Sequence, residues 1–167
     1  DCNRSNFHFI TGGLASSKSA TSADYLYSGY DKGHLLDFES VSYDCVLGES
    51  TFRYYNSYPQ RPELNRGISK SQESDIRKIS QTSHLIIFVG GFYGYKTIGN
   101  GVSVPDTCFK IVYSIEAKKV IVSTIFTNTN KPIRTDIDSK NLIKKIELRY
   151  NININKIINN KSLKPKK

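Results

Sequence analysis

The chain has no tryptophan or methionine, only three histidines and three cysteines, and no long apolar run. Its longest apolar stretches, Leu85–Val89 and Val120–Phe126, have the length of a strand and fall far short of the ~18 residues of a membrane span. No membrane partner is therefore expected. None of the cysteines has another cysteine or a histidine at the spacing of metal ligands, so a structural zinc site is not expected either.

The three cysteines, Cys2, Cys45 and Cys108, allow one disulfide and one free thiol. Cys45–Cys108 is the favoured pair because both residues lie in the body of the domain, and a fully reduced set is the alternative. The chain begins without methionine, a basic segment or an apolar segment. A secreted or periplasmic protein looks like this after its signal peptide is removed, and so does a chain that was shortened for another reason.

The charge of the chain favours a polyanionic partner. The 167 residues carry a formal net charge of +9 with a pI of about 9.4, which suits nucleic acid or an anionic surface. Part of the excess belongs to an Asn- and Lys-rich end, residues 151–167, where a solvated tail is the simpler interpretation. The length predicts one domain, residues 1–167, with a loop-rich N-terminal region at residues 1–24.

The pattern of apolar residues and turn formers predicts an α+β fold with a central, mostly antiparallel sheet flanked by helices. A short strand over 25–30 leads to His34, residues 37–50 form a loop, and a second strand covers 51–56. Pro59 and Pro62 end that strand, and a helix follows from 63–65 to about 82 with Ile68, Ile76 and Ile79 on its apolar side. The later predicted elements are a strand at 85–89 that ends at a Gly-Gly break, an antiparallel hairpin of 109–115 and 119–126, and a closing helix capped by Asp138 or Ser139 with Leu142, Ile143 and Ile146 facing inward.

Two polar patches carry the residue types that phosphodiester hydrolysis requires. The first is Tyr30–Leu35, with sequence YDKGHL, and the second begins with Asn56–Gln60 and continues through Asn65-Arg66-Gly67 to Glu73. A neutral histidine can take a proton from water near physiological pH. Amide and carboxylate oxygens suit Mg²⁺, which keeps most of its waters, and cationic side chains can hold phosphate.

These patches resemble the DNA/RNA non-specific endonucleases, the ββα-metal or His-Me finger nucleases. That family carries Asp-Arg-Gly-His, then Asn-x-x-Pro-Gln, then Asn followed by Glu and Arg at fixed spacing. The order and spacing agree here, although Lys32 replaces the usual arginine and the chain has no tryptophan after Asn65-Arg66-Gly67. The matching positions are Asp31, Lys32, Gly33, His34, Asn56, Pro59, Gln60, Asn65, Glu73 and Arg77.

The resemblance implies a role for each side chain. His34 is the expected general base, and Asn65 is the expected direct ligand of Mg²⁺, for which Mn²⁺ can substitute. Glu73 is expected to hold metal-bound water, because an ideal helix would separate it from Asn65 by roughly 12 Å. Asp31 either holds metal waters in the same way or anchors the structure. Asn56 either shapes the site as a catalytic asparagine or only forms a turn.

The cations of the two patches are the expected phosphate contacts. Arg77 lies one turn beyond Glu73, so it binds phosphate, pairs with Glu73, or does both. Lys32 attracts phosphate without the bidentate fork of an arginine. Arg4 is a possible upstream phosphate-binding arginine. His8 and His84 lie outside the two patches and are expected to be structural.

The expected function is a Mg²⁺-dependent endonuclease that cuts DNA and RNA to leave 5′-phosphate ends, within a fold that contains a ββα-metal unit. Two alternatives stay open at this point. One is a nucleic-acid-binding module on a nuclease scaffold with weak or no activity, and the other is a metal-dependent phosphodiesterase for a smaller substrate. An inhibitor protein or a second copy of the chain as a partner cannot be deduced from the sequence.

Overall fold

A computed structural model describes residues 2–12, 19–160 and 162 of the chain. The fold is α+β, as predicted, with a two-stranded and a four-stranded antiparallel sheet. No helix within the described ranges is both long and apolar enough to cross a membrane. The strands are β1 Asp31–His34, β2 Ser57–Gln60, β3 Leu85–Ile98, β4 Val102–Ser114, β5 Lys119–Thr127 and β6 Arg134–Asp136, and the α-helices are α1 Ser22–Tyr25, α2 Cys45–Ser50, α3 Lys70–Ser80, α4 Ser139–Tyr150 and α5 Ile154–Ile158.

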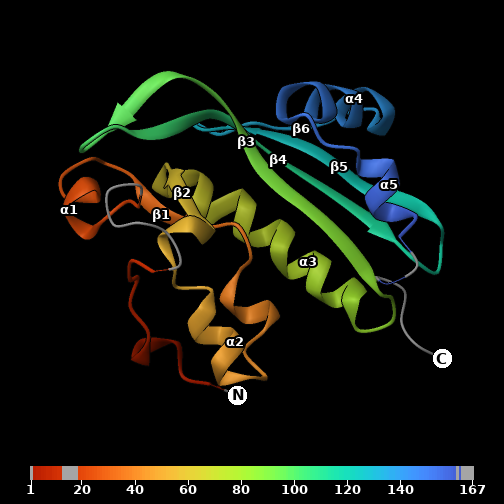
Figure 1. Ribbon diagram of the computed structural model, residues 1–167, viewed down its shortest axis with the longest axis horizontal. Coiled ribbons are helices and arrows are strands. Elements are labelled where there is room, and N and C mark those ends of the chain that lie inside the picture. Colours follow the sequence, from red (N-terminus) through yellow and green to blue (C-terminus); the bar gives the residue numbers. More distant parts are fainter. Residues whose placement is uncertain (1, 13–18, 161, 163–167) are drawn as a thin grey trace.

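The larger sheet separates two layers (Figure 1). Helices α4 and α5 cover one face, and α3 with the β1–β2 ribbon covers the other. Alternation along β4 explains both layers, because neighbouring residues of a strand point to opposite faces. Phe109 and Ile111 pack with Leu142, Ile146 and Ile154 of α4 and α5. On the other face, a smaller cluster consists of Tyr58, Leu64, Cys108 and Phe126.

The strands of this sheet are longer than the sequence indicated. The expected break at Gly90-Gly91 is wrong, because β3 continues through both glycines and pairs Gly90 with Phe109. A Cβ atom on Gly90 would lie 2.6 Å from Cζ of the Phe109 ring, so this glycine makes room for an aromatic neighbour and does not end the strand. The β4–β5 hairpin is confirmed, with Ser114 opposite Lys119.

The predicted positions of the first two strands are wrong. Residues 22–25 form the short helix α1, and β1 consists of the Asp-Lys-Gly-His segment itself. Residues 54–56 form a 3₁₀ turn, and β2 begins after it and includes Pro59, which was expected to end a strand. Proline is tolerated there because a two-stranded ribbon has only edge strands, so the missing N–H group need not break the pairing with β1.

The predicted loop over 37–50 contains a 3₁₀ turn, Phe38–Ser40, and helix α2. The predicted helix from 63–65 to about 82 exists in two parts. A π-helical segment, Leu64–Ser69, has a kink at Gly67, where φ is −102° and ψ is −111°, and α3 follows it. Because of this kink, Asn65 and Glu73 do not lie on one straight helix.

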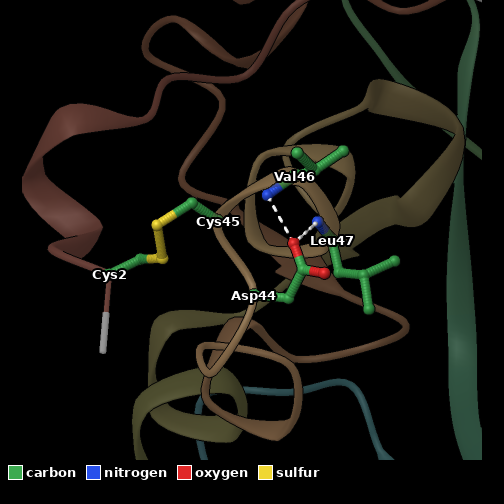
Figure 2. Close-up of a disulfide and its surroundings, with 5 residues drawn as sticks. All are labelled: Cys2, Asp44, Cys45, Val46 and Leu47. Carbon is green, nitrogen blue, oxygen red and sulfur yellow. Dashed lines mark hydrogen bonds between the residues drawn. A yellow bond between two sulfur atoms is a disulfide. The ribbon is translucent and has the colours of Figure 1, made fainter.

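The disulfide joins Cys2 to Cys45, so the favoured Cys45–Cys108 pairing is wrong (Figure 2). Cys108 lies in β4 and is buried as a free thiol in the cluster with Tyr58. The bridge fixes the N-terminal segment to the start of α2, where Asp44 caps the helix by accepting hydrogen bonds from the backbone N–H groups of Val46 and Leu47. The sequence separation of these cysteines gave no sign that the N-terminal segment folds back onto the domain.

The C-terminal part is more ordered than expected. Helix α4 is capped by Asp138, as predicted, and buries Leu142 and Ile146. Residues 151–160 were expected to be a compositionally biased end, yet they contain α5, whose Ile154 and Ile158 are buried in the core. The terminal lysines that were assigned to a solvated tail lie outside the described residues: Lys161, Lys164, Lys166 and Lys167.

Gly33→Ala should lower the free energy of unfolding by about 1–3 kcal/mol, the usual cost of overpacking. A Cβ atom at Gly33 would lie 2.0 Å from Oε1 of Gln60, which is itself buried against Tyr58. Urea unfolding measures the change. Gly12→Ala is the control, because its Cβ would meet only the flexible end of Arg53, and an equal loss in both variants would contradict the explanation.

Candidate active site

A cavity of about 380 Å³ collects most of the predicted functional residues. It lies where β1 meets the π-helical segment and α3, with residues of the N-terminal segment and of the turn after β1 at its edge. The predicted residues that line it are Arg4, Lys32, His34, Asn65, Glu73 and Arg77, and the further lining residues are Asp37, Glu39, Arg66 and Lys70.

His34 packs against two aromatic rings that also contact each other. Its imidazole centroid is 4.8 Å from that of Phe9 and 5.0 Å from that of Phe52, which meets it edge-on. Phe9 belongs to the N-terminal segment that the disulfide fixes. The Nε2 atom is buried and has no hydrogen-bond partner among the described residues. The packing therefore fixes the ring and removes much of its water.

This environment keeps His34 neutral. Burial, the largest cause, and the positive charge of Arg4 lower the pKa of His34 from 6.5 to about 4, although Asp37 acts in the opposite direction. Removing water disfavours the charged imidazolium, so the neutral form, which can accept a proton, persists well below pH 6.5.

Asn65 is held at one end of its amide. Its Nδ2 donates to Oδ2 of Asp31 at 3.0 Å, and Arg66 donates to both oxygens of the same carboxylate at 2.8 and 2.6 Å. Burial raises the pKa of Asp31, but the hydrogen bonds from Arg66 and Asn65 outweigh it and the pKa is lowered. Both carboxylate oxygens accept bonds from protein groups, which favours the anchoring alternative for Asp31. The Oδ1 atom of Asn65 accepts no hydrogen bond from the described residues.

Glu73 is held in a similar way. Its Oε1 accepts from Nζ of Lys110 and from Oγ of Ser69, each at 3.2 Å. Lys110 comes from β4 and its side chain is only 7% exposed, so this ion pair crosses from the sheet to α3 in a largely buried position. The second carboxylate oxygen of Glu73 has no hydrogen-bond partner among the described residues.

The expected pairing of Arg77 with Glu73 does not occur. Nη1 of Arg77 donates instead to Oδ1 of Asp37 at 2.6 Å, with both side chains half-buried. Asp37 also caps the 3₁₀ turn at Ser40, so its position is fixed from the turn as well as from α3. Arg77 has five donors, and the remaining ones stay available to a phosphate.

Asn56 does not line the cavity, because its side chain forms hydrogen bonds with the backbone of the segment after His34. Its Nδ2 donates to the carbonyl groups of Leu36 and Thr51 at 2.9 and 3.0 Å, and its Oδ1 accepts from the N–H of Leu36 at 3.1 Å. Asn56, the last residue of the 3₁₀ turn 54–56, therefore positions the segment that follows the histidine without lining the cavity itself.

Lys32 also lines the cavity, with its ammonium group 5.7–5.8 Å from the ring centroids of Phe9, Tyr25 and Tyr54. The other two histidines lie elsewhere. His8 is exposed, and Nδ1 of His84 lies 2.7 Å from Oε1 of Glu116 beside the β4–β5 turn.

Comparison with known proteins shows the family of the chain. A model of the DNA/RNA non-specific endonuclease family matches residues 1–161. The chain belongs to this family. Mitochondrial Endonuclease G from Bos taurus is 28% identical over 142 residues, which cover 77% of this chain and 48% of that protein. A nuclease from Nostoc sp. (strain PCC 7120 / SAG 25.82 / UTEX 2576) is 31% identical over 112 residues, which cover 65% of this chain and 40% of that protein. This family member therefore spans about half the length of the curated relatives it matches.

A solved structure shares the fold of this family member. The structure of the EndoG/EndoGI complex, which describes the mechanism of EndoG inhibition, superposes with a TM-score of 0.73 at 22% identity and covers 87% of this chain and 67% of that chain. The ββα-metal type of fold, which the sequence patches predicted, is thereby confirmed.

The donor set of this family member fits a magnesium ion. Two oxygens of the cavity-lining residues, Oδ1 of Asn65 and one oxygen of Glu73, are without protein partners in the described part of the chain, while their neighbouring atoms are fixed by Asp31 and Lys110. Within the same residues no cluster of three or more His, Cys, Asp or Glu side chains could hold a metal. Magnesium does not need one, because it keeps several waters and accepts few protein ligands.

Several residues at this site were not predicted, and three of them fix the predicted side chains: Asp37, Arg66 and Lys110. Arg66 lies within the second patch, and its bidentate contact with Asp31 follows from the pairing geometry of arginine and carboxylate. Asp37 follows His34 closely and could have been considered as a partner for Arg77. Lys110 was the hardest of the three to predict, because its contact with Glu73 depends on the strand register that places β4 beneath α3.

The acid limb of kcat/KM should lie well below pH 6.5, because His34 stays neutral until its depressed pKa of about 4 is approached. Arg4→Gln should move that limb to higher pH, since a positive charge that opposes protonation is lost. Arg134→Gln, on β6, is the control of equal charge change.

The folded-state pKa of His34 lies below the unfolded value, so the free energy of unfolding should also fall as pH drops from 6.5 toward 4. An acid limb centred near pH 6.5 in the wild type would contradict this account.

Proposed function

We propose that this chain is a Mg²⁺-dependent endonuclease that hydrolyses phosphodiester bonds of DNA and RNA. The observation that supports the proposal is the single cavity lined by His34, Asn65, Glu73 and Arg77. A neutral base, free oxygen donors and cations thus face one volume that is large enough for a phosphate and its attacking water. Loss of any one of these groups would leave the proposed reaction incomplete.

In this proposal, His34 takes the proton of the attacking water. The water oxygen forms a bond to phosphorus, the bond from phosphorus to the 3′ oxygen breaks, and the products carry a 5′-phosphate and a 3′-hydroxyl. A positioned general base contributes about 10²–10⁴-fold to such a step. The rings of Phe9 and Phe52 hold the imidazole, which reduces the freedom that it must lose as the water approaches.

The substrate is held by charge. Backbone phosphates carry most of the affinity of proteins that cut without sequence preference, and their binding weakens as salt rises. Arg77 and Lys32 are the proposed phosphate contacts, and Asp37 keeps the Arg77 side chain at the cavity. The cations that line the cavity are Arg4, Lys32, Arg66, Lys70 and Arg77.

Asn65 would hold Mg²⁺ directly and Glu73 would hold it through water. When bound, the ion polarises the phosphate and stabilises the charge that develops on the leaving oxygen. Asp31 orients Asn65 by accepting from its Nδ2, so the amide oxygen is the end left for the ion. Mn²⁺ accepts the same oxygen ligands and is expected to substitute.

The proposed setting of the enzyme is a compartment outside the reducing cytosol, since disulfides such as Cys2–Cys45 persist under oxidising conditions. The related Endonuclease G occurs in a solved complex that describes its inhibition, and an inhibitor protein is by analogy a candidate partner for this chain.

His34→Ala should reduce cleavage of plasmid DNA and of RNA by at least 10²-fold, because the base is lost. Added imidazole should restore part of the activity by entering the space between Phe9 and Phe52. His84→Ala is the control, since its side chain lies on the surface beside Glu116. Cleavage by His34→Ala within tenfold of the wild type would refute the assignment of the base.

Asn65→Ala should raise the Mg²⁺ concentration required for half-maximal cleavage by tenfold or more, because the direct ligand is removed. Direct binding of Mn²⁺ should weaken in parallel. A chelator should abolish cleavage by the wild type. Asn130→Ala, an exposed asparagine of the β5–β6 loop, is the matched control. Unchanged metal dependence in the Asn65 variant would mean that another residue holds the ion.

A further inference from the structure

A second hollow lies beside the catalytic cavity. It has a volume of about 510 Å³ and is lined by the aromatic and apolar side chains of Tyr25, Leu26 and Tyr30. Its other wall consists of Lys32, Asn65 and Arg66, and these three residues also line the catalytic cavity. The two spaces therefore share a wall, and a chain bound in one can continue into the other.

The second hollow is cationic. The guanidinium of Arg61 lies 4.5 Å and the ammonium of Lys96 lies 5.2 Å from the ring centroid of Tyr30. The nearest acids do not offset this charge at the surface. Asp31 is already bound by Arg66, and Asp24 is buried.

The position of Lys96 is fixed by the tip of the β3–β4 hairpin, which docks on α1 (Figure 1). The backbone N–H of Asn100 donates to Oδ1 of Asp24 at 2.8 Å. At Gly99, a Cβ atom would lie 2.4 Å from Cα of Asp24, so the two backbones are in close contact. The hairpin is thus held where Lys96 can reach the rim of the hollow.

Tyr27 follows Leu26, a residue that lines the hollow, and its side chain packs against almost nothing. Its side chain is 98% exposed, and it follows Leu26, which is 64% exposed. Its φ of 54° lies in the left-handed region, where a tyrosine is strained. Neither burial nor backbone preference explains a tyrosine at this position, whereas an exposed ring one residue from the lining of a cationic hollow is suited to stacking on a base.

We propose that this hollow is a subsite for an unpaired nucleotide that flanks the scissile phosphate of a single-stranded substrate. Lys32 and Lys96 bind its phosphate, and Tyr27 stacks on its base. A paired base must lose its pairing and stacking in the duplex before it can stack on Tyr27, so the subsite favours single strands over duplexes. The inference rests on the proposed nuclease function and adds the form of substrate that the site prefers.

The test uses the chain of 167 residues and one nucleotide sequence, which is offered as a labelled single-stranded oligonucleotide and as a duplex. Tyr27→Gly removes the ring and also suits the left-handed backbone, so this variant should fold at least as well as the wild type. Its KM for the single strand should rise roughly tenfold, the effect of losing one stacked base, with kcat unchanged and the duplex little affected. Tyr27→Phe should retain the wild-type KM.

Lys96→Gln should raise the same KM and reduce its salt dependence, while Lys140→Gln on α4 is the control of equal charge change. Tyr43→Ala is the control for an exposed tyrosine away from the hollow. Binding of an oligothymidylate to variants in a His34→Ala background reports the subsite without cleavage. Equal affinity of Tyr27→Gly and wild type for the single strand would overturn the subsite, whereas a wild type that binds oligothymidylate but cleaves nothing would refute only the nuclease function.

Discussion

The carboxylate of Asp31 joins the two parts of the site that different elements supply. It extends from β1, the strand that carries His34, and accepts hydrogen bonds from Asn65 and Arg66 at the start of the helical segment. Because an amide has one donor end and one acceptor end, holding Nδ2 also decides where Oδ1 points. A bidentate contact with arginine is among the stronger and more directional of ionic hydrogen bonds. The relative position of His34 and Asn65, the proposed base and metal ligand, thus depends on this one carboxylate.

Buried charge is the recurring cost of this arrangement. The pairs Glu73–Lys110 and Asp37–Arg77 are both largely withdrawn from water. Such pairs stabilise a fold little, because desolvation offsets most of the attraction, but removing one partner leaves the other uncompensated. Their consequence is geometric, since each pair ties α3 to another element and fixes a side chain at the cavity. His34 differs from these pairs, because burial among aromatic rings keeps its imidazole neutral.

The sequence predicted which residues come together in the cavity better than it predicted the local structure around them. The two patches identified the cavity residues because spacing in a motif follows chemical requirements. The positions of β1 and β2 were wrong because Pro59 lies inside a two-stranded ribbon, where the usual penalty on proline does not apply. Helix α5 was missed because its Asn- and Lys-rich composition hid two core isoleucines. Lys110 and the Cys2–Cys45 bridge depend on contacts between distant segments, which local pattern cannot supply.

The bridge between Cys2 and Cys45 turns the first quarter of the chain into a covalent ring. The ring spans a sequence separation of 43 residues and includes Phe9, all of β1 and the 3₁₀ turn after it. Within the part of the ring that the structure describes, regular secondary structure is limited to short elements. In the chain-entropy model, closing a ring of this size removes about 4 kcal/mol of conformational freedom from the unfolded chain. His34, the proposed general base, is thus held in place partly by a restriction on the unfolded state, whereas the larger sheet relies on its ladder of hydrogen bonds.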